Sequence, residues 1–293
     1  MTGPVVVGLD GAPASVTAAW WAAREAADRH LPLLLLHSWT SRPFDVPAAR
    51  KALARQRRGS QILQRTQSEL LERYADLDLV TELVPVDAAQ ALLDASGTAS
   101  LLVLGSQGHG PLTGFVLGSI SLHVLGLSRC PTVTVRADDP AVESGWGRPA
   151  AADRQEIVVG VREAGPASAP LLEFAFTSAD LHGARVRAVR ALPVSSLVTH
   201  PPVGRADEGY ETDEHGRLAA ALAPWRQKFP GIDVVDHVAR GPAAQVLLTA
   251  SAQGMLTVLG RRRHPSPLTW KLGPVAQAAL HHAPCPVAVV PHD

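Results

Sequence analysis

Short apolar runs alternate along this chain with longer segments that mix alanine and leucine with charged residues. The short runs predict buried strands and the longer segments predict helices with one apolar face. In the first half the predicted strands are Val5–Asp10, Leu31–Trp39, Leu79–Pro85, Leu101–Leu104 and Thr132–Arg136. The predicted helices are Val16–Arg29, with Ser15 as its N-cap, Ala48–Tyr74, Ala88–Ser96 and Ile120–Leu127. Strands that alternate with helices in this way predict a parallel α/β sheet covered on both faces.

The second half repeats the same order of elements. Its predicted strands are Glu156–Val161, Val186–Ala191, Val234–Val238, Leu256–Leu259 and Val287–Val290. Its predicted helices are Ala169–Leu181, Asp213–Phe229, Ala243–Ala252 and Val275–His282. We therefore expect two tandem five-stranded parallel α/β sandwich domains, over residues 1–137 and 154–293. Residues 138–153, which show little periodicity, are the predicted linker.

Composition narrows the class of partner. The chain has 293 residues, a formal net charge of zero and only 4% aromatic residues, so nucleic acid and anionic membranes are not expected partners. Five of the nine residues in 50–58 are basic, but no aromatic residues interleave with them, which favours an exposed helix face over a nucleic-acid site. The apolar run Leu31–Leu36 is too short to span a bilayer and no basic leader precedes it, so we expect a cytoplasmic protein.

The chain has 2 cysteines, Cys130 and Cys285, and each is followed by proline at the matching place of its repeat. This placement favours small buried core residues over a disulfide or a metal pair. No dedicated metal site is expected, because no carboxylate cluster resembles one.

A glycine pattern follows the fourth predicted strand. Gly105-Ser106-Gln107-Gly108 is separated by nine residues from Gly118-Ser119, where the next helix begins. Glycines directly after a strand let backbone N–H groups approach an anion, and the start of a helix adds unpaired N–H groups and a positive dipole end. The pattern therefore predicts a phosphate-binding loop.

With these features in place, the chain resembles the universal stress protein family in its tandem two-domain form. The family signature Gly-x2-Gly-x9-Gly-Ser/Thr is met by Gly105, Gly108, Gly118 and Ser119. The resemblance implies a Rossmann-like fold of the adenine nucleotide alpha hydrolase type. It also implies that Asp10 contacts the adenosine part of ATP, while the glycine loop and Ser119 hold the phosphates, with Mg²⁺ as their companion.

Two further residues near the loop have alternative roles. His109 either touches a phosphate or lines the solvent edge of the loop, and Ser121 either contacts the terminal phosphate or caps the helix. The first half also departs from the family pattern after its third strand. It has Val84-Pro85-Val86-Asp87 where the second half keeps the glycine-proline turn Gly241-Pro242, and a β-branched Val86 resists a positive φ.

The second half lacks much of the signature. Arg162 stands in the place of Asp10, Arg263 in that of Gly108 and Pro274 in that of Ser119. The first change removes an acceptor, the second fills the space that a phosphate needs, and the third removes an N–H donor and a hydroxyl. We therefore expect that the second half does not bind ATP in the family's manner. Two alternatives remain for the basic residues of this region, a pocket for another anion or a solvated positive loop. They are Arg261, Arg262, Arg263 and Lys271.

Three functions follow as hypotheses. The leading one is an ATP-binding, nucleotide-sensing module of the stress response, in which the first domain binds nucleotide. One alternative is a slow ATPase or phosphotransfer enzyme, against which the sequence has no Gly-x4-Gly-Lys-Ser/Thr loop. The other is a structural protein that binds no nucleotide. The terminal strands Thr132–Arg136 and Val287–Val290 are expected at sheet edges, where the two halves would pair as a pseudo-dimer and two chains could associate as a homodimer.

Overall fold

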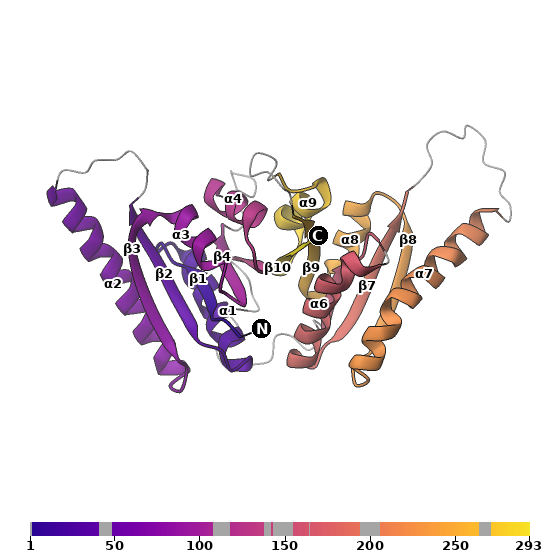
Figure 1. Cartoon of the computed structure of the whole chain (residues 1–293), viewed down its shortest axis with the longest axis horizontal. Helices are drawn as coiled ribbons and strands as arrows, with labels where there is room; N and C mark the ends of the chain where they lie inside the picture. The colour runs from indigo at the N-terminus through magenta and orange to yellow at the C-terminus, as the bar shows by residue number, and fades with distance from the viewer. Residues whose placement is uncertain are drawn as a thin grey trace. The chain divides into compact units, whose positions relative to one another are not determined.

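Each half of the chain forms its own parallel α/β unit (Figure 1). The computed structural model describes residues 2–40, 49–107, 118–137, 142, 155–163, 165–193, 206–263 and 271–293. The predicted linker, 138–153, lies outside these residues except for position 142, so the predicted domain boundaries stay a prediction.

The order of elements is the same in the two units. In the first unit they are β1 (Val5–Gly8), α1 (Pro13–Asp28), β2 (Leu33–Thr40), α2 (Ala49–Arg73), β3 (Leu79–Asp87), α3 (Ala88–Ala95), β4 (Leu101–Ser106), α4 (Ser119–Leu127) and β5 (Thr132–Arg136). In the second they are β6 (Glu156–Gly160), the short 3-10 helix η1 (Pro166–Ser168), α6 (Ala169–His182), β7 (Arg185–Leu192), α7 (Ala206–Lys228), β8 (Val234–Arg240), α8 (Ala243–Ser251), β9 (Gly254–Arg262), α9 (Pro274–His282) and β10 (Val287–His292). The predicted fold class, with parallel strands alternating with helices, is therefore confirmed.

The sheet of the first unit has the strand order β3-β2-β1-β4-β5, and that of the second has β8-β7-β6-β9-β10. The chain leaves β1 toward β2 and β3, and then returns to the other side of β1 to form β4 and β5. The strand order thus reverses between β1 and β4. In open α/β sheets this reversal opens a crevice at the carboxyl ends of the two strands, where ligands bind.

Helices cover both faces of each sheet. In the first unit α1 packs on β1, β4 and β5, and α2 packs on β2 and β3, while α3 and α4 contact each other. Right-handed crossovers place the first two helices on one face and the last two on the other. The strands between these layers are buried on both faces, so Val5–Val7 and Leu101–Leu104 are at most 4% exposed. This burial explains why both segments are apolar throughout.

Two local predictions need revision. Ser15 is not the N-cap of α1, because the helix begins at Pro13 after Ala12 and the Ser15 hydroxyl bonds Asp10 instead. The third strand runs on to Asp87, whose side chain accepts hydrogen bonds from the backbone of α3 and so caps that helix. Val86 stays extended within the strand, and the first unit needs no glycine at this turn.

The cysteine prediction is confirmed. Cys130 is 5% exposed and Cys285 is 1% exposed, and both thiols are free. Burial raises the pKa of the Cys130 thiol above its ordinary value, so this group is an unreactive core residue.

Candidate functional site

Asp10 lies directly beyond the carboxyl end of β1, in a tight turn before α1. Its Oδ1 accepts a hydrogen bond from the Ser15 hydroxyl at 2.6 Å and from the Ala12 N–H at 2.9 Å. The Asp10 N–H in turn donates to Ser15 Oγ at 3.2 Å. Gly11 makes the turn possible, because its φ of +83° is one that side-chain-bearing residues rarely adopt. The exposed carboxylate is therefore held in one orientation at the sheet edge.

Gly105 lies beside this turn on the adjacent strand. Val7 of β1 pairs with Val103 of β4, so the register brings the ends of the two strands together. The backbone of α1 crosses Gly105 so closely that a Cβ there would lie 2.5 Å from the carbonyl carbon and oxygen of Ala14. The missing side chain at Gly105 is thus required by helix packing. The sequence had indicated only a role in approaching an anion.

Gly118 and Ser119 form the start of α4, and both are exposed. Gly118 has φ −59° and ψ 149°, which any residue can adopt, and nothing among the described residues lies within 4 Å of a Cβ built on it. Within the part of the chain that the structure describes, no side chain caps this helix start. Ser121, two residues further, is half-buried, whereas Gly108 and His109 lie outside the described residues.

A second wall of the site comes from β2 and α2. The ring nitrogen Nδ1 of His37 lies 2.5 Å from the Leu9 carbonyl oxygen, which can only accept, so Nδ1 carries the proton. The His37 ring packs on Gly59 of α2, where a Cβ would lie 2.6 Å from Cδ2. Ile62 of the same helix packs over Gly11. Sequence reasoning missed His37 and Gly59, although a polar residue in an apolar strand and a glycine inside a helix are both signals of a special contact.

The corresponding edge of the second unit is occupied differently. Arg162, in the place of Asp10, points its side chain into solvent, with 90% of that side chain exposed. Its carbonyl accepts a hydrogen bond from Arg190 of β7, which also pairs with the buried Glu214 of α7. Pro274 is the first residue of α9 and supplies no N–H there. The second unit therefore has no side-chain acceptor in the place of Asp10 and no N–H donor in the place of Ser119.

The basic residues at the end of β9 do not behave as one group. Arg262 lies 3.5 Å from Glu163, and Arg263 lies 3.5 Å from Asp293, and all four side chains are more than half exposed. Arg261 is only 8% exposed. Burial, together with the positive charge of Arg263, lowers the pKa of Arg261 to about 10, so it remains charged at neutral pH. The solvated-loop alternative therefore fits Arg262 and Arg263 but not Arg261.

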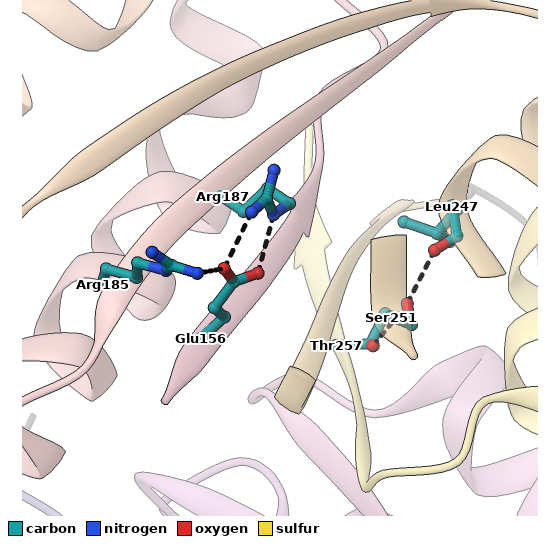
Figure 2. Close-up of polar contacts among 6 residues, drawn as sticks. All are labelled: Glu156, Arg185, Arg187, Leu247, Ser251 and Thr257. Carbon is teal, nitrogen blue, oxygen red and sulfur yellow. Dashed lines mark hydrogen bonds and ion pairs between the residues drawn. The ribbon is translucent and has the colours of Figure 1, made fainter. Parts of the chain in front are cut away.

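Other polar contacts of the second unit serve its internal structure (Figure 2). Glu156 of β6 receives two hydrogen bonds from Arg187 and one ion pair from Arg185. Hydrogen bonding by Arg187 holds the pKa of the Glu156 carboxyl below its usual range. Ser251 and Thr257 join their hydroxyls at 2.8 Å, and Ser251 donates to the Leu247 carbonyl. A cavity of about 480 Å³ beside Glu156 and Arg185 opens at the amino ends of the strands, away from the edge that carries the candidate site.

Fold and site together define a protein of two Rossmann-like α/β units, the first of which has Asp10 and Gly105 at the carboxyl edge of its sheet. The universal stress protein family matches this chain twice, over residues 1–136 and 154–291. The chain belongs to the universal stress protein family.

Relatives align with both units. A universal stress protein of Mycolicibacterium smegmatis is 29% identical over 294 residues, which cover 98% of this chain and 96% of the relative. One from Mycobacterium tuberculosis is 28% identical over 295 residues, covering 97% and 96%. The chain is thus similar to tandem proteins along their length.

Solved structures agree on the fold. A universal stress protein from Archaeoglobus fulgidus is 16% identical with a TM-score of 0.71, and the match covers 99% of this chain and 98% of that one. A putative universal stress protein from Pseudomonas aeruginosa is 18% identical with a TM-score of 0.60. At these identities the likeness shows the fold alone. No helix in the described parts of the chain is long and apolar enough to cross a membrane.

Proposed function

We propose that this protein binds an adenine nucleotide, ATP with Mg²⁺, in its first unit, and that it acts as a nucleotide-sensing or regulatory module in the response to stress. The observation that carries the proposal is the turn at Asp10. Ser15 and Ala12 hold its carboxylate at the carboxyl end of β1, beside Gly105 and at the point where the strand order reverses.

The residues present fit the chemistry of such a ligand. The Asp10 carboxylate can accept hydrogen bonds from ribose hydroxyls or from the adenine amino group. The Ser119 hydroxyl and the N–H groups of the first turn of α4 suit phosphate oxygens, and the helix dipole favours their negative charge. Mg²⁺ would travel with the phosphates and neutralise part of that charge.

The second unit supports one site per chain instead of two. Arg162 offers no acceptor in the place of Asp10, and Pro274 removes both the hydroxyl and the N–H that Ser119 supplies. The second unit then contributes structure, or recognition of something other than ATP.

Isothermal titration of the full chain with Mg-ATP tests the proposal, run beside the variants Gly118→Val and Gly273→Val. Gly118 and Gly273 both precede a helix with nothing described within 4 Å of an added Cβ, so each variant should fold normally. We expect about one site per chain, lost in Gly118→Val and unchanged in Gly273→Val. An unmodified chain that binds no nucleotide would refute the proposal, and two sites would refute the assignment to the first unit.

Self-association through the terminal edge strands remains a separate prediction. Among the described residues of its own unit, β5 pairs with β4 on one side, and β10 likewise pairs with β9 on one side. A strand that ends its own unit's sheet can accept a further strand on its other side. Light scattering on a size-exclusion column would test the homodimer, and a strict monomer at high concentration would exclude it.

A further inference from the structure

In each unit, one residue of the second strand contacts one residue of the long helix that follows it, and the two units differ in this pair. The pair is His37 with Gly59 in the first unit and Arg190 with Glu214 in the second. Arg190 corresponds to His37, since His37 pairs across its sheet with Leu83 and Arg190 pairs with Val238 at the same register. Glu214 corresponds to Gly59, because each lies at the same distance from the end of its helix. The turns after those helices match as well, with Leu77 donating to Tyr74 in one unit and Ile232 to Phe229 in the other.

In the first unit the pair is an imidazole and a glycine. His37 reaches the Leu9 carbonyl, one residue before Asp10, and its ring packs so closely on Gly59 that a Cβ would be 2.6 Å from Cδ2 and 2.9 Å from Nε2. Gly59 is buried, so the contact between β2 and α2 is closed by the imidazole itself.

In the second unit the pair is a buried ion pair. The Glu214 side chain is 1% exposed and accepts from both Arg190 and Arg217. Arg190 extends further than a histidine and donates to the carbonyl of Arg162, the residue in the place of Asp10. Its guanidinium therefore occupies the end of β6, and the carboxylate of Glu214 keeps that charge neutralised and in place.

We infer that His37 with Gly59 is required for the first unit to accept nucleotide, because this pair leaves the carboxyl end of β1 accessible beside Asp10, whereas Arg190 with Glu214 fills the same place in the second unit, which also lacks the acceptor and donor of Asp10 and Ser119. This inference rests on the proposed function of the first unit. His37 and Gly59 are specificity-determining residues, and they act through the space they leave and through the Leu9 carbonyl that His37 holds. Excluding a ligand by filling its place is a common route to selectivity.

The test transplants the second unit's pair into the first. The variant is His37→Arg/Gly59→Glu/Leu83→Val. The third change is needed because a Cβ at position 59 would lie 2.8 Å from Leu83 Cδ1, and the second unit has the smaller Val238 there. The second unit shows that the fold accepts this combination. The matched control is the reverse exchange in the second unit, Arg190→His/Glu214→Gly/Val238→Leu.

Mg-ATP affinity is measured by titration calorimetry on full-length chains whose folding is checked by circular dichroism. We expect the first variant to bind at least about tenfold more weakly than the unmodified chain, and the control to bind within about twofold of it. A folded first variant that binds as tightly as the unmodified chain overturns the inference and leaves the proposed function intact. An unmodified chain that binds no nucleotide overturns both.

Hydrogen–deuterium exchange of the unmodified chain covers the case in which the first variant does not fold. Saturating Mg-ATP should slow exchange in peptides spanning residues 33–40 and 55–63, which carry His37 and Gly59. Peptides spanning 185–192 and 211–218, which carry Arg190 and Glu214, should not change. Protection that spares the first two peptides, or that reaches all four equally, contradicts the inference.

Discussion

Replacing Gly105 with alanine should destabilise the first unit, because the missing side chain is where α1 crosses β4. An added Cβ would lie 2.5 Å from the Ala14 carbonyl carbon and oxygen and 2.6 Å from the Ser15 nitrogen. All three atoms belong to backbone, so no rotamer change can relieve the contact. The start of α1 would have to move away from the sheet by about 1 Å to restore ordinary van der Waals separation.

The size of the effect follows from two consequences of that movement. Overpacking of a close-packed interior costs about 1–3 kcal/mol. The shift also displaces Ser15, whose hydrogen bond to the Asp10 carboxylate at 2.6 Å is worth roughly 1 kcal/mol or more. Because the two terms overlap, we expect Gly105→Ala to lower the free energy of unfolding by about 2–3 kcal/mol.

Urea unfolding followed by circular dichroism measures this loss, and two other glycines of the repeated pattern give a graded control. A Cβ at Gly260 would lie 3.0 Å from the His292 ring, which can move, so Gly260→Ala should cost about 1 kcal/mol or less. Gly118→Ala meets nothing described within 4 Å and should change stability by under about 0.5 kcal/mol. If Gly105→Ala were as stable as Gly118→Ala, the packing role of Gly105 would be refuted.

Two further predictions concern single side chains. Ser15→Ala should lower the free energy of unfolding by about 1–2 kcal/mol and weaken Mg-ATP binding, because Asp10 loses its hydrogen-bond partner at 2.6 Å. The control Ser68→Ala removes an exposed hydroxyl from α2 and should change neither quantity in the same calorimetric assays. Hydrogen bonding by Arg187 lowers the pKa of Glu156, so its stabilising contribution is complete above the ordinary glutamate pKa of about 4.3 and is lost as the pH falls through the lowered value. Thermal melts at decreasing pH should therefore show a smaller acid loss in Glu156→Gln than in the unmodified chain, and equal losses would exclude the linkage.

Much of the fold could be predicted because strand and helix periods are local properties of the sequence. Leu101–Leu104 is apolar throughout because β4 is buried on both faces, and β5 was predicted with its observed bounds, Thr132–Arg136. The ends of strands are harder to predict from sequence. Pro85 favours a turn and Val86 favours a strand, and β3 continues through both. A proline is tolerated there because β3 lies at the edge of the first unit's sheet.

The sequence predicts the place of a candidate site residue when its position relative to a strand is enough to locate it in the fold. Asp10 and Gly105 end adjacent strands of a parallel sheet, so their proximity follows from topology. Ser15 was assigned the wrong role because a serine near a helix start suits an N-cap as well as a carboxylate five residues earlier. His37 and Gly59 could not be paired from sequence, since their contact joins β2 to a helix whose rotation depends on the packed unit.

The glycine pattern contains residues of two physical kinds, and the repeat separates them. Gly105 and its counterpart Gly260 each have neighbours within 3.0 Å of an added Cβ, so packing accounts for both without any ligand. Gly118 and Gly273 precede helices in open space and in a conformation open to any residue. A spacing of glycines can therefore survive in a unit that has lost its ligand groups. Under the proposed function, the positions that would report binding are those whose side chains offer ligand groups, above all Asp10 and Ser119, and these are the positions where the second unit has arginine and proline.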